Sequence, residues 1–87
     1  MLKISQIGTQ NHRISLKLEG RVVGPWVEEL RRICEPLLIG ESCVTLDLTD
    51  VSYADSEGVA TLNSFKASGV ELENCSPFLE QQIKFSN

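Results

Sequence analysis

The sequence lacks the features that mark nucleic-acid-binding and membrane-spanning proteins. Its 87 residues contain eight Lys and Arg against twelve Asp and Glu, a formal net charge of −4, and the basic residues never cluster. Because nucleic-acid binding depends on neutralising phosphates with a basic face, we expect no nucleic-acid partner. No apolar run approaches the roughly 20 residues of a bilayer span, and the N-terminus lacks the apolar region of a signal peptide. The sequence therefore indicates a cytoplasmic protein with no membrane insertion.

Metal ligands and catalytic motifs are also scarce. There is a single histidine, His12, and the three cysteines, Cys34, Cys43 and Cys75, are widely spaced with no CxxC pair. Because each cysteine lies in or beside an apolar run, we predict reduced, buried thiols and no metal site. The sequence has no G-x-S-x-G, GxxxxGK[ST] or GxGxxG motif, and no histidine near Ser56 to act as its base. We therefore predict that the protein is not an enzyme and binds no cofactor.

Four carboxylates lie close together in the sequence, which could suggest an acid/base pair or a metal-binding cup. We interpret Asp47 as a strand residue, Asp50 as a turn former and Asp55 as the cap of a helix that Glu57 then continues. Structural roles therefore account for the three aspartates without a catalytic site.

What the chain does contain is an alternation of strand and helix patterns. Apolar and polar residues alternate in residues 2–5 and again in 13–19, with a polar break at 8–12 between them. Two alternating runs across a short polar loop predict a β-hairpin that is half buried and half solvated. His12 lies in that loop, where we interpret it as a solvated turn residue.

The hairpin is followed by an amphipathic helix. Pro25 suits a first helical position, and apolar residues from Trp26 to Leu38 recur at the spacing of one helix face. Pro36 lacks a backbone N–H and clashes with the preceding turn, so we predict that the helix ends or bends near residues 34–35.

The rest of the chain repeats strand and helix. We predict a buried strand at 43–48, a turn at 49–54, a helix at 57–68, a strand at 70–73 and a last helix that begins at Ser76–Pro77. The order β β α β α β α predicts a single small α/β domain, residues 1–87. Its four-stranded mixed sheet consists of the N-terminal hairpin followed by parallel crossovers, with about three helices packed on it.

Polar loops are expected to meet at one edge of this sheet. In parallel crossovers the strand-to-helix loops, here residues 20–25, 49–56 and 74–77, emerge at the carboxyl edge of the sheet. Each loop ends at a helix N-terminus, where unpaired N–H groups favour an anionic or hydroxyl group. This edge is the candidate binding surface. On spacing alone, Ser56 is as well explained by a helix cap as by a functional serine.

One stretch carries a resemblance to a known family. Residues 46–62 read LDLTDVSYADSEGVATL, and they resemble the signature of the STAS family of anti-sigma factor antagonists and their relatives. That signature is an apolar strand ending in Asp, a short turn, Asp-Ser-Ser/Thr-Gly and an apolar helix. The G-R-V-x-G loop at Arg21 and the closing Ser-Pro also match, although the second helix and the fourth strand look shortened.

The resemblance implies a non-catalytic protein-binding module of bacterial signal transduction and transcription regulation. Its expected partner is an anti-sigma factor that is also a serine kinase, and the expected docking point is the 55–58 turn, residues Asp55 to Gly58. The residues that it assigns to partner binding are Asp55, Ser56, Glu57, Gly58, Val59, Arg21 and Trp26.

The sequence departs from this pattern at one residue. The family's usual phosphoacceptor is the second hydroxyl of the motif, and that position is Glu57, which cannot accept a phosphate ester. Glutamate also carries about −1 charge, where phosphoserine carries about −1.5 to −2. Either the phospho-switch has been lost, which is the hypothesis we favour, or the acceptor has moved to Ser56. We expect the hydroxyl of Ser56 to be engaged by the backbone at the helix cap.

A second class of function stays open. The protein could be a structural subunit or scaffold whose partner is not a kinase, such as a transporter ATPase or a signalling assembly. An exposed Trp26 beside the glycine-containing loop would suit an interface anchor in either class. The sequence shows no glycine-rich phosphate loop that would indicate nucleotide binding.

Overall fold

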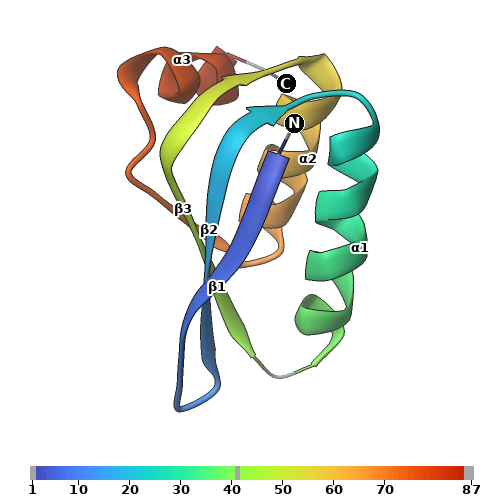
Figure 1. The fold of residues 1–87 in the computed structure, drawn as a ribbon, viewed down its shortest axis with the longest axis vertical. Helices are drawn as coiled ribbons and strands as arrows, with labels where there is room; N and C mark the ends of the chain where they lie inside the picture. Colours follow the sequence, from blue (N-terminus) through green and yellow to red (C-terminus); the bar gives the residue numbers. More distant parts are fainter. Residues whose placement is uncertain (1, 41, 86–87) are drawn as a thin grey trace.

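The computed structural model describes residues 2–40 and 42–85. In chain order its elements are β1 (Leu2–Gln10), β2 (Arg13–Val22), α1 (Pro25–Ile39), β3 (Cys43–Ala54), α2 (Ser56–Ala67), β4 (Glu71–Glu73) and α3 (Pro77–Phe85) (Figure 1). They form a 4-stranded sheet in the order β1-β2-β3-β4, in which β1 is antiparallel to β2 and the other pairs are parallel. The predicted order of elements and the mixed sheet are confirmed.

The hairpin turns more tightly than its sequence suggested. Gln10 pairs directly with Arg13, so only Asn11 and His12 lie between the strands. Both have positive φ angles, 50° and 68°, as a two-residue turn that matches the right-handed strand twist requires. Asparagine tolerates this conformation well, which explains why the polar break at 8–12 does not interrupt β1.

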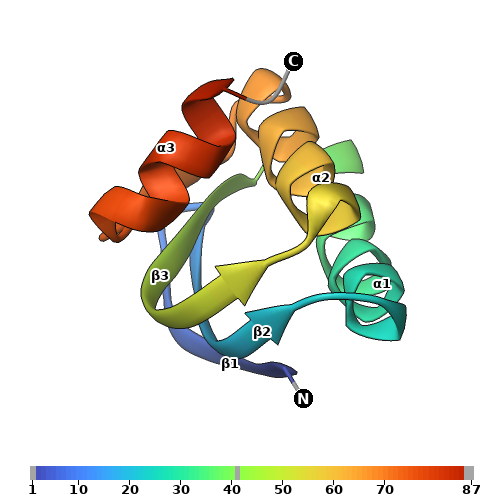
Figure 2. The same ribbon diagram turned by 90° about the horizontal axis from the view of Figure 1, so that it is seen from above.

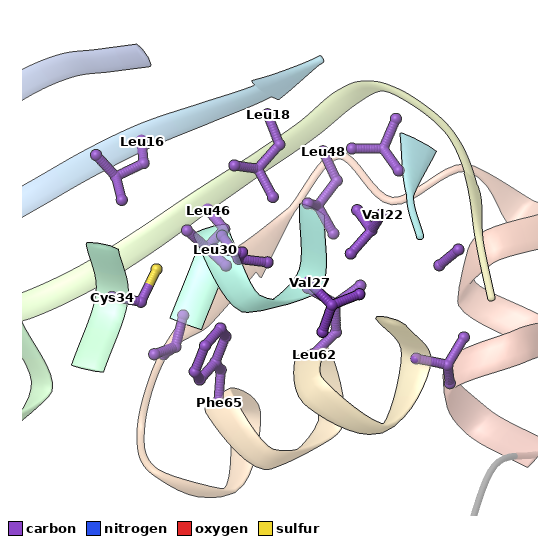
Figure 3. Packing of buried hydrophobic residues seen from close by; sticks show 14 of the residues in the cluster. Leu16, Leu18, Val22, Val27, Leu30, Cys34, Leu46, Leu48, Leu62 and Phe65 are labelled. Atoms are coloured by element: carbon purple, nitrogen blue, oxygen red, sulfur yellow. The ribbon is translucent and has the colours of Figure 1, made fainter. Parts of the chain in front are cut away.

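The three helices cover one face of the sheet. Seen from above, α1, α2 and α3 all lie on its concave side (Figure 2). The core between the layers contains Leu16 and Leu18 of β2, Leu46 and Leu48 of β3, Val27, Leu30 and Cys34 of α1, and Leu62 and Phe65 of α2 (Figure 3). The alternate residues of β2 and β3, such as Lys17 and Asp47, face the other way and are polar, so the second face of the sheet is open to solvent.

Helix α1 does not end where its proline predicted. It continues through Pro36 to Ile39. A proline at this position removes only the hydrogen bond to the carbonyl of Arg32, one turn earlier. Both residues are exposed, so water can satisfy that carbonyl, and Leu37 and Leu38 still pack against the core.

Strand β3 is much longer than predicted, because the expected turn at 49–54 is part of it. Two register shifts against β2, after Lys17 and after Gly20, give β3 an extra residue each time. Such bulges bend a strand, and they change the spacing of its buried side chains from two residues to three. Asp50, which we interpreted as a turn former, therefore lies in the strand, where its carboxylate is 3.0 Å from the Lys17 ammonium.

The cysteines have three different environments. Cys34 is fully buried, and this burial raises the pKa of its thiol to about 11. Cys75 is half-buried and Cys43 is exposed, and all three thiols are free. The prediction of buried thiols therefore holds for Cys34 and is wrong for Cys43. Cys43 alternates with the buried Val44 along β3 and so lies on the solvent face of the sheet.

Candidate functional site

The 55–58 turn connects the end of β3 to the start of α2. Asp55 is the N-cap, with extended backbone angles, and its Oδ1 accepts a hydrogen bond from the N–H of Gly58 at 2.7 Å. The carbonyl of Asp55 accepts from the N–H of Val59 at 2.8 Å and so begins the helical ladder. The predicted cap is confirmed, and it satisfies one of the N–H groups that a helix start leaves unpaired.

Asp55 also binds the loop that follows β2. Its second oxygen, Oδ2, accepts from the N–H of Gly24 at 3.0 Å, and its own N–H donates to the carbonyl of Val22 at 3.2 Å. The hydrogen bonds from Gly24 and Gly58 hold the pKa of this carboxyl below its usual range. One carboxylate therefore fixes two loops that are 31 residues apart in the sequence.

Gly58 is required by the close approach of α2 to the end of β2. A Cβ atom at this position would lie 2.1 Å from the carbonyl oxygen of Val22, which is backbone and cannot turn away. Gly58 and the next residue, Val59, are both buried. These two residues hold the turn in place and present no side-chain surface of their own.

Ser56 and Glu57 are the exposed part of the turn. They are the first two residues of α2, and both side chains face solvent. Because Asp55 takes the cap position, the hydroxyl of Ser56 makes no hydrogen bond to any described residue, contrary to the expected backbone contact. The turn thus places an unbonded hydroxyl and a carboxylate side by side at the positive end of the helix dipole.

Arg21 and Trp26 flank the loop that Asp55 holds. Arg21 is exposed near the end of β2 and is opposite Tyr53 of β3 in the sheet register. Trp26, the second residue of α1, is half-buried and packs against the core. Trp26 therefore offers only part of its ring to a partner.

The third polar loop does not join the other two. Ser76 caps α3 as predicted, by accepting from the N–H of Leu79 at 3.1 Å, and Asn74 donates to the carboxylate of Asp47 at 3.2 Å. Strand β4 has only three residues and ends opposite Asp47, which lies well before Asp55 along β3. The loop that follows β4 therefore begins far from the 55–58 turn. The expected meeting of three loops is therefore wrong for residues 74–77.

The sequence did not reveal the role of Gly24. Its positive φ of 52° suits glycine, and its N–H is the donor that connects α1's entry loop to Asp55. The G-R-V-x-G pattern contained this residue, but its partner is distant in sequence. The carboxylates form no alternative site: among the described residues, no group of three or more His, Cys, Asp or Glu could hold a metal ion.

A comparison with solved structures now adds to this geometry. The structure of the anti-sigma factor antagonist SpoIIAA in its unphosphorylated form matches with a TM-score of 0.78. The match covers 95% of this chain and 83% of that chain, at 18% sequence identity. This chain has the STAS fold. The resemblance found in residues 46–62 is therefore confirmed at the level of the fold.

Comparisons by sequence found no match that would extend this result. No family model matches the chain, and no curated protein matches it. No helix in the described ranges is long and apolar enough to cross a membrane.

Proposed function

We propose that residues 1–87 are a STAS-like, non-catalytic module that binds a regulatory protein through the 55–58 turn. The observation that carries the proposal is the pair of exposed side chains, Ser56 and Glu57, at a helix start that Asp55 fixes to the loop after β2. The likeness to an anti-sigma factor antagonist supports an anti-sigma factor with serine kinase activity as the partner. A cytoplasmic location and a role in bacterial transcription regulation belong to the same proposal.

A rigid surface of this kind suits a protein partner. Because Asp55 and the Gly58–Val22 contact already order the turn, little conformational entropy is lost when a partner docks on it. Arg21 and the exposed part of Trp26 extend the surface around Gly24. A groove of about 1060 Å³ elsewhere on the molecule includes none of these residues.

We further propose that the contact has no phospho-switch at its usual position. Glu57 holds that position with a permanent charge and no hydroxyl. The exposed hydroxyl of Ser56 nevertheless keeps the shifted-acceptor hypothesis open, because no backbone group of the described residues holds it in a hydrogen bond.

Binding is tested by calorimetric titration with a candidate anti-sigma factor. We expect Glu57→Arg to weaken binding at least about tenfold, because it reverses a charge at the centre of the proposed contact. Glu35→Arg is the matched control, since Glu35 is also exposed but lies on α1 away from the turn. Equal affinities for the two variants would contradict docking through the turn.

Phosphorylation is tested with the same kinase, ATP and mass spectrometry. We expect no phosphate on the wild type, and phosphate on Glu57→Ser that weakens its binding. Phosphate on Ser56 of the wild type would show that the acceptor has moved by one residue. Failure of every variant to bind or react would favour a non-kinase partner such as a transporter ATPase or a signalling assembly.

A further inference from the structure

The edge strand β4 has an unpaired backbone on its far side. Its residues Glu71, Leu72 and Glu73 pair with β3, and within the described part of the chain no strand lies beyond them. An unpaired strand edge presents a row of N–H and C=O groups that another extended chain can bind. This edge is well removed from the 55–58 turn and shares no residue with it.

A groove of about 1060 Å³ lies beside this edge. Its other walls are formed by residues of α2 and α3, two helices that pack against each other (Figure 2). Its apolar part comes from Val70, Leu72, Ile83 and the half-buried Cys75. A strand added to a sheet lies about 4.8 Å from its neighbour. Alternate side chains of such a strand would therefore lie over this apolar part of the groove.

The solvent face of the same edge is acidic. Glu71 and Glu73 are exposed, and neither forms an ion pair with a described residue. Asp47 of β3 is in register with Glu73, so three carboxylates lie together on this face. Oppositely charged residues on neighbouring strands stabilise a sheet, and like charges destabilise it. An added strand is therefore favoured if its solvent-facing residues are Lys or Arg.

We propose that β4 and this groove bind an extended segment of a partner protein in which apolar residues alternate with Lys or Arg. Backbone hydrogen bonds to β4 supply the general affinity, and the two rows of side chains supply the specificity. The inference goes beyond the proposed function, because it concerns a second surface.

The first test uses the peptide Lys-Val-Arg-Val-Lys-Val-Arg, acetylated and amidated, in a titration followed by NMR. We expect a Kd below about 1 mM, with the largest amide shifts in β4 and the groove. The control peptide, Lys-Arg-Val-Val-Val-Arg-Lys, has the same composition and charge without the alternation, and we expect it to bind at least about fivefold more weakly. Absence of binding, equal binding of both peptides, or shifts centred elsewhere would overturn the proposal.

A second test asks whether the peptide backbone pairs with β4. In an extended chain, successive N–H groups point to opposite edges. One peptide is therefore N-methylated at its valines, and a second at an equal number of basic residues. We expect one of the two to lose binding and the other to keep an affinity within about twofold of the unmodified peptide. Equal losses would show that side chains alone hold the peptide.

Variants of the protein complete the test. We expect Glu71→Lys combined with Glu73→Lys to weaken binding of the alternating peptide at least about fivefold, while the exposed control Glu35→Lys has no effect. Circular dichroism verifies that the variants remain folded. If instead the protein alone self-associates with rising concentration and the double variant abolishes that, a second copy of this chain is the occupant and the proposal is wrong.

Discussion

The helices α2 and α3 begin in similar ways, but their starts are fixed to the molecule to very different degrees. Each follows a parallel strand and has a cap side chain that accepts from the backbone three residues on: Asp55 from Gly58, and Ser76 from Leu79. Asp55 has a second oxygen, which accepts a hydrogen bond from Gly24 in another loop, whereas the hydroxyl of Ser76 bonds only its own helix among the described residues. A carboxylate can therefore cap a helix and also link it to a distant segment. Asp55 is such a cap, and it begins the proposed docking turn.

The close contact behind the α2 cap gives the largest expected effect. Gly58→Ala places a Cβ against the carbonyl of Val22, so the helix must move away from β2, and we expect a loss of about 3 kcal/mol in the free energy of unfolding, measured with urea. Gly8→Ala is the matched control: no atom lies within 4 Å of its added Cβ, so its effect should stay within about 0.5 kcal/mol. Equal stabilities would mean that α2 is not held tightly to β2.

Removing the two caps tests the comparison directly. Asp55→Ala loses the hydrogen bonds to Gly58 and Gly24, and we expect it to cost about 2 to 3 kcal/mol of stability. Ser76→Ala loses a single local bond and should cost about 1 kcal/mol. Urea unfolding of both variants measures the difference. Equal costs would show that the link to Gly24 contributes nothing.

Substitutions at the two caps should also differ in how their cost in stability depends on pH. The pKa of Asp55 is lowered in the folded state, so the stability that its carboxylate supplies is present above its unfolded pKa of about 3.9 and is lost as the pH falls through the lower folded value. We therefore expect the stability gap between wild type and Asp55→Asn to narrow in this acid range. The cost of Ser76→Ala should stay constant there, because its hydroxyl does not titrate. A constant gap for both would contradict the role of the charged form of Asp55.

The smallest expected effect concerns the serine that follows the α2 cap. Ser56→Ala removes a hydroxyl that has no hydrogen bond to a described residue, so stability should change by less than about 0.5 kcal/mol. Thermal and urea unfolding measure this. A cost as large as that of Ser76→Ala would show that Ser56 shares the capping role and would weaken its assignment to the docking surface.

Much of the fold follows from local patterns, and what they missed depends on contacts between distant residues. The order of the elements and the cap roles of Asp55 and Ser76 were predictable, since periodicity and cap residues are local signals. The bulges of β3 were not predictable. They change the spacing of buried side chains from two residues to three, so the sequence of residues 49–54 resembles a turn.

The position of the candidate site could be proposed from the sequence, but its hydrogen bonds and close contacts could not. Residues 55–58 were identified from their likeness to a family signature, and the cap was evident. The hydrogen bond from Gly24 to Asp55 and the contact of Gly58 with Val22 both join segments far apart in sequence, so no local pattern contains them. The free hydroxyl of Ser56 depends in turn on which of two adjacent residues takes the cap, a choice that only the assembled turn decides.

The reactivity of the buried Cys34 can measure local unfolding of the core. A thiol reagent reacts with the thiolate, and a cysteine that is fully buried with a pKa of about 11 forms almost none while α1 stays on the sheet. The exposed Cys43 would be modified at once, and Cys34 only in those moments when the helix leaves the sheet. The delay between the two reactions therefore measures how often the native protein opens locally, and no label has to be introduced into the chain.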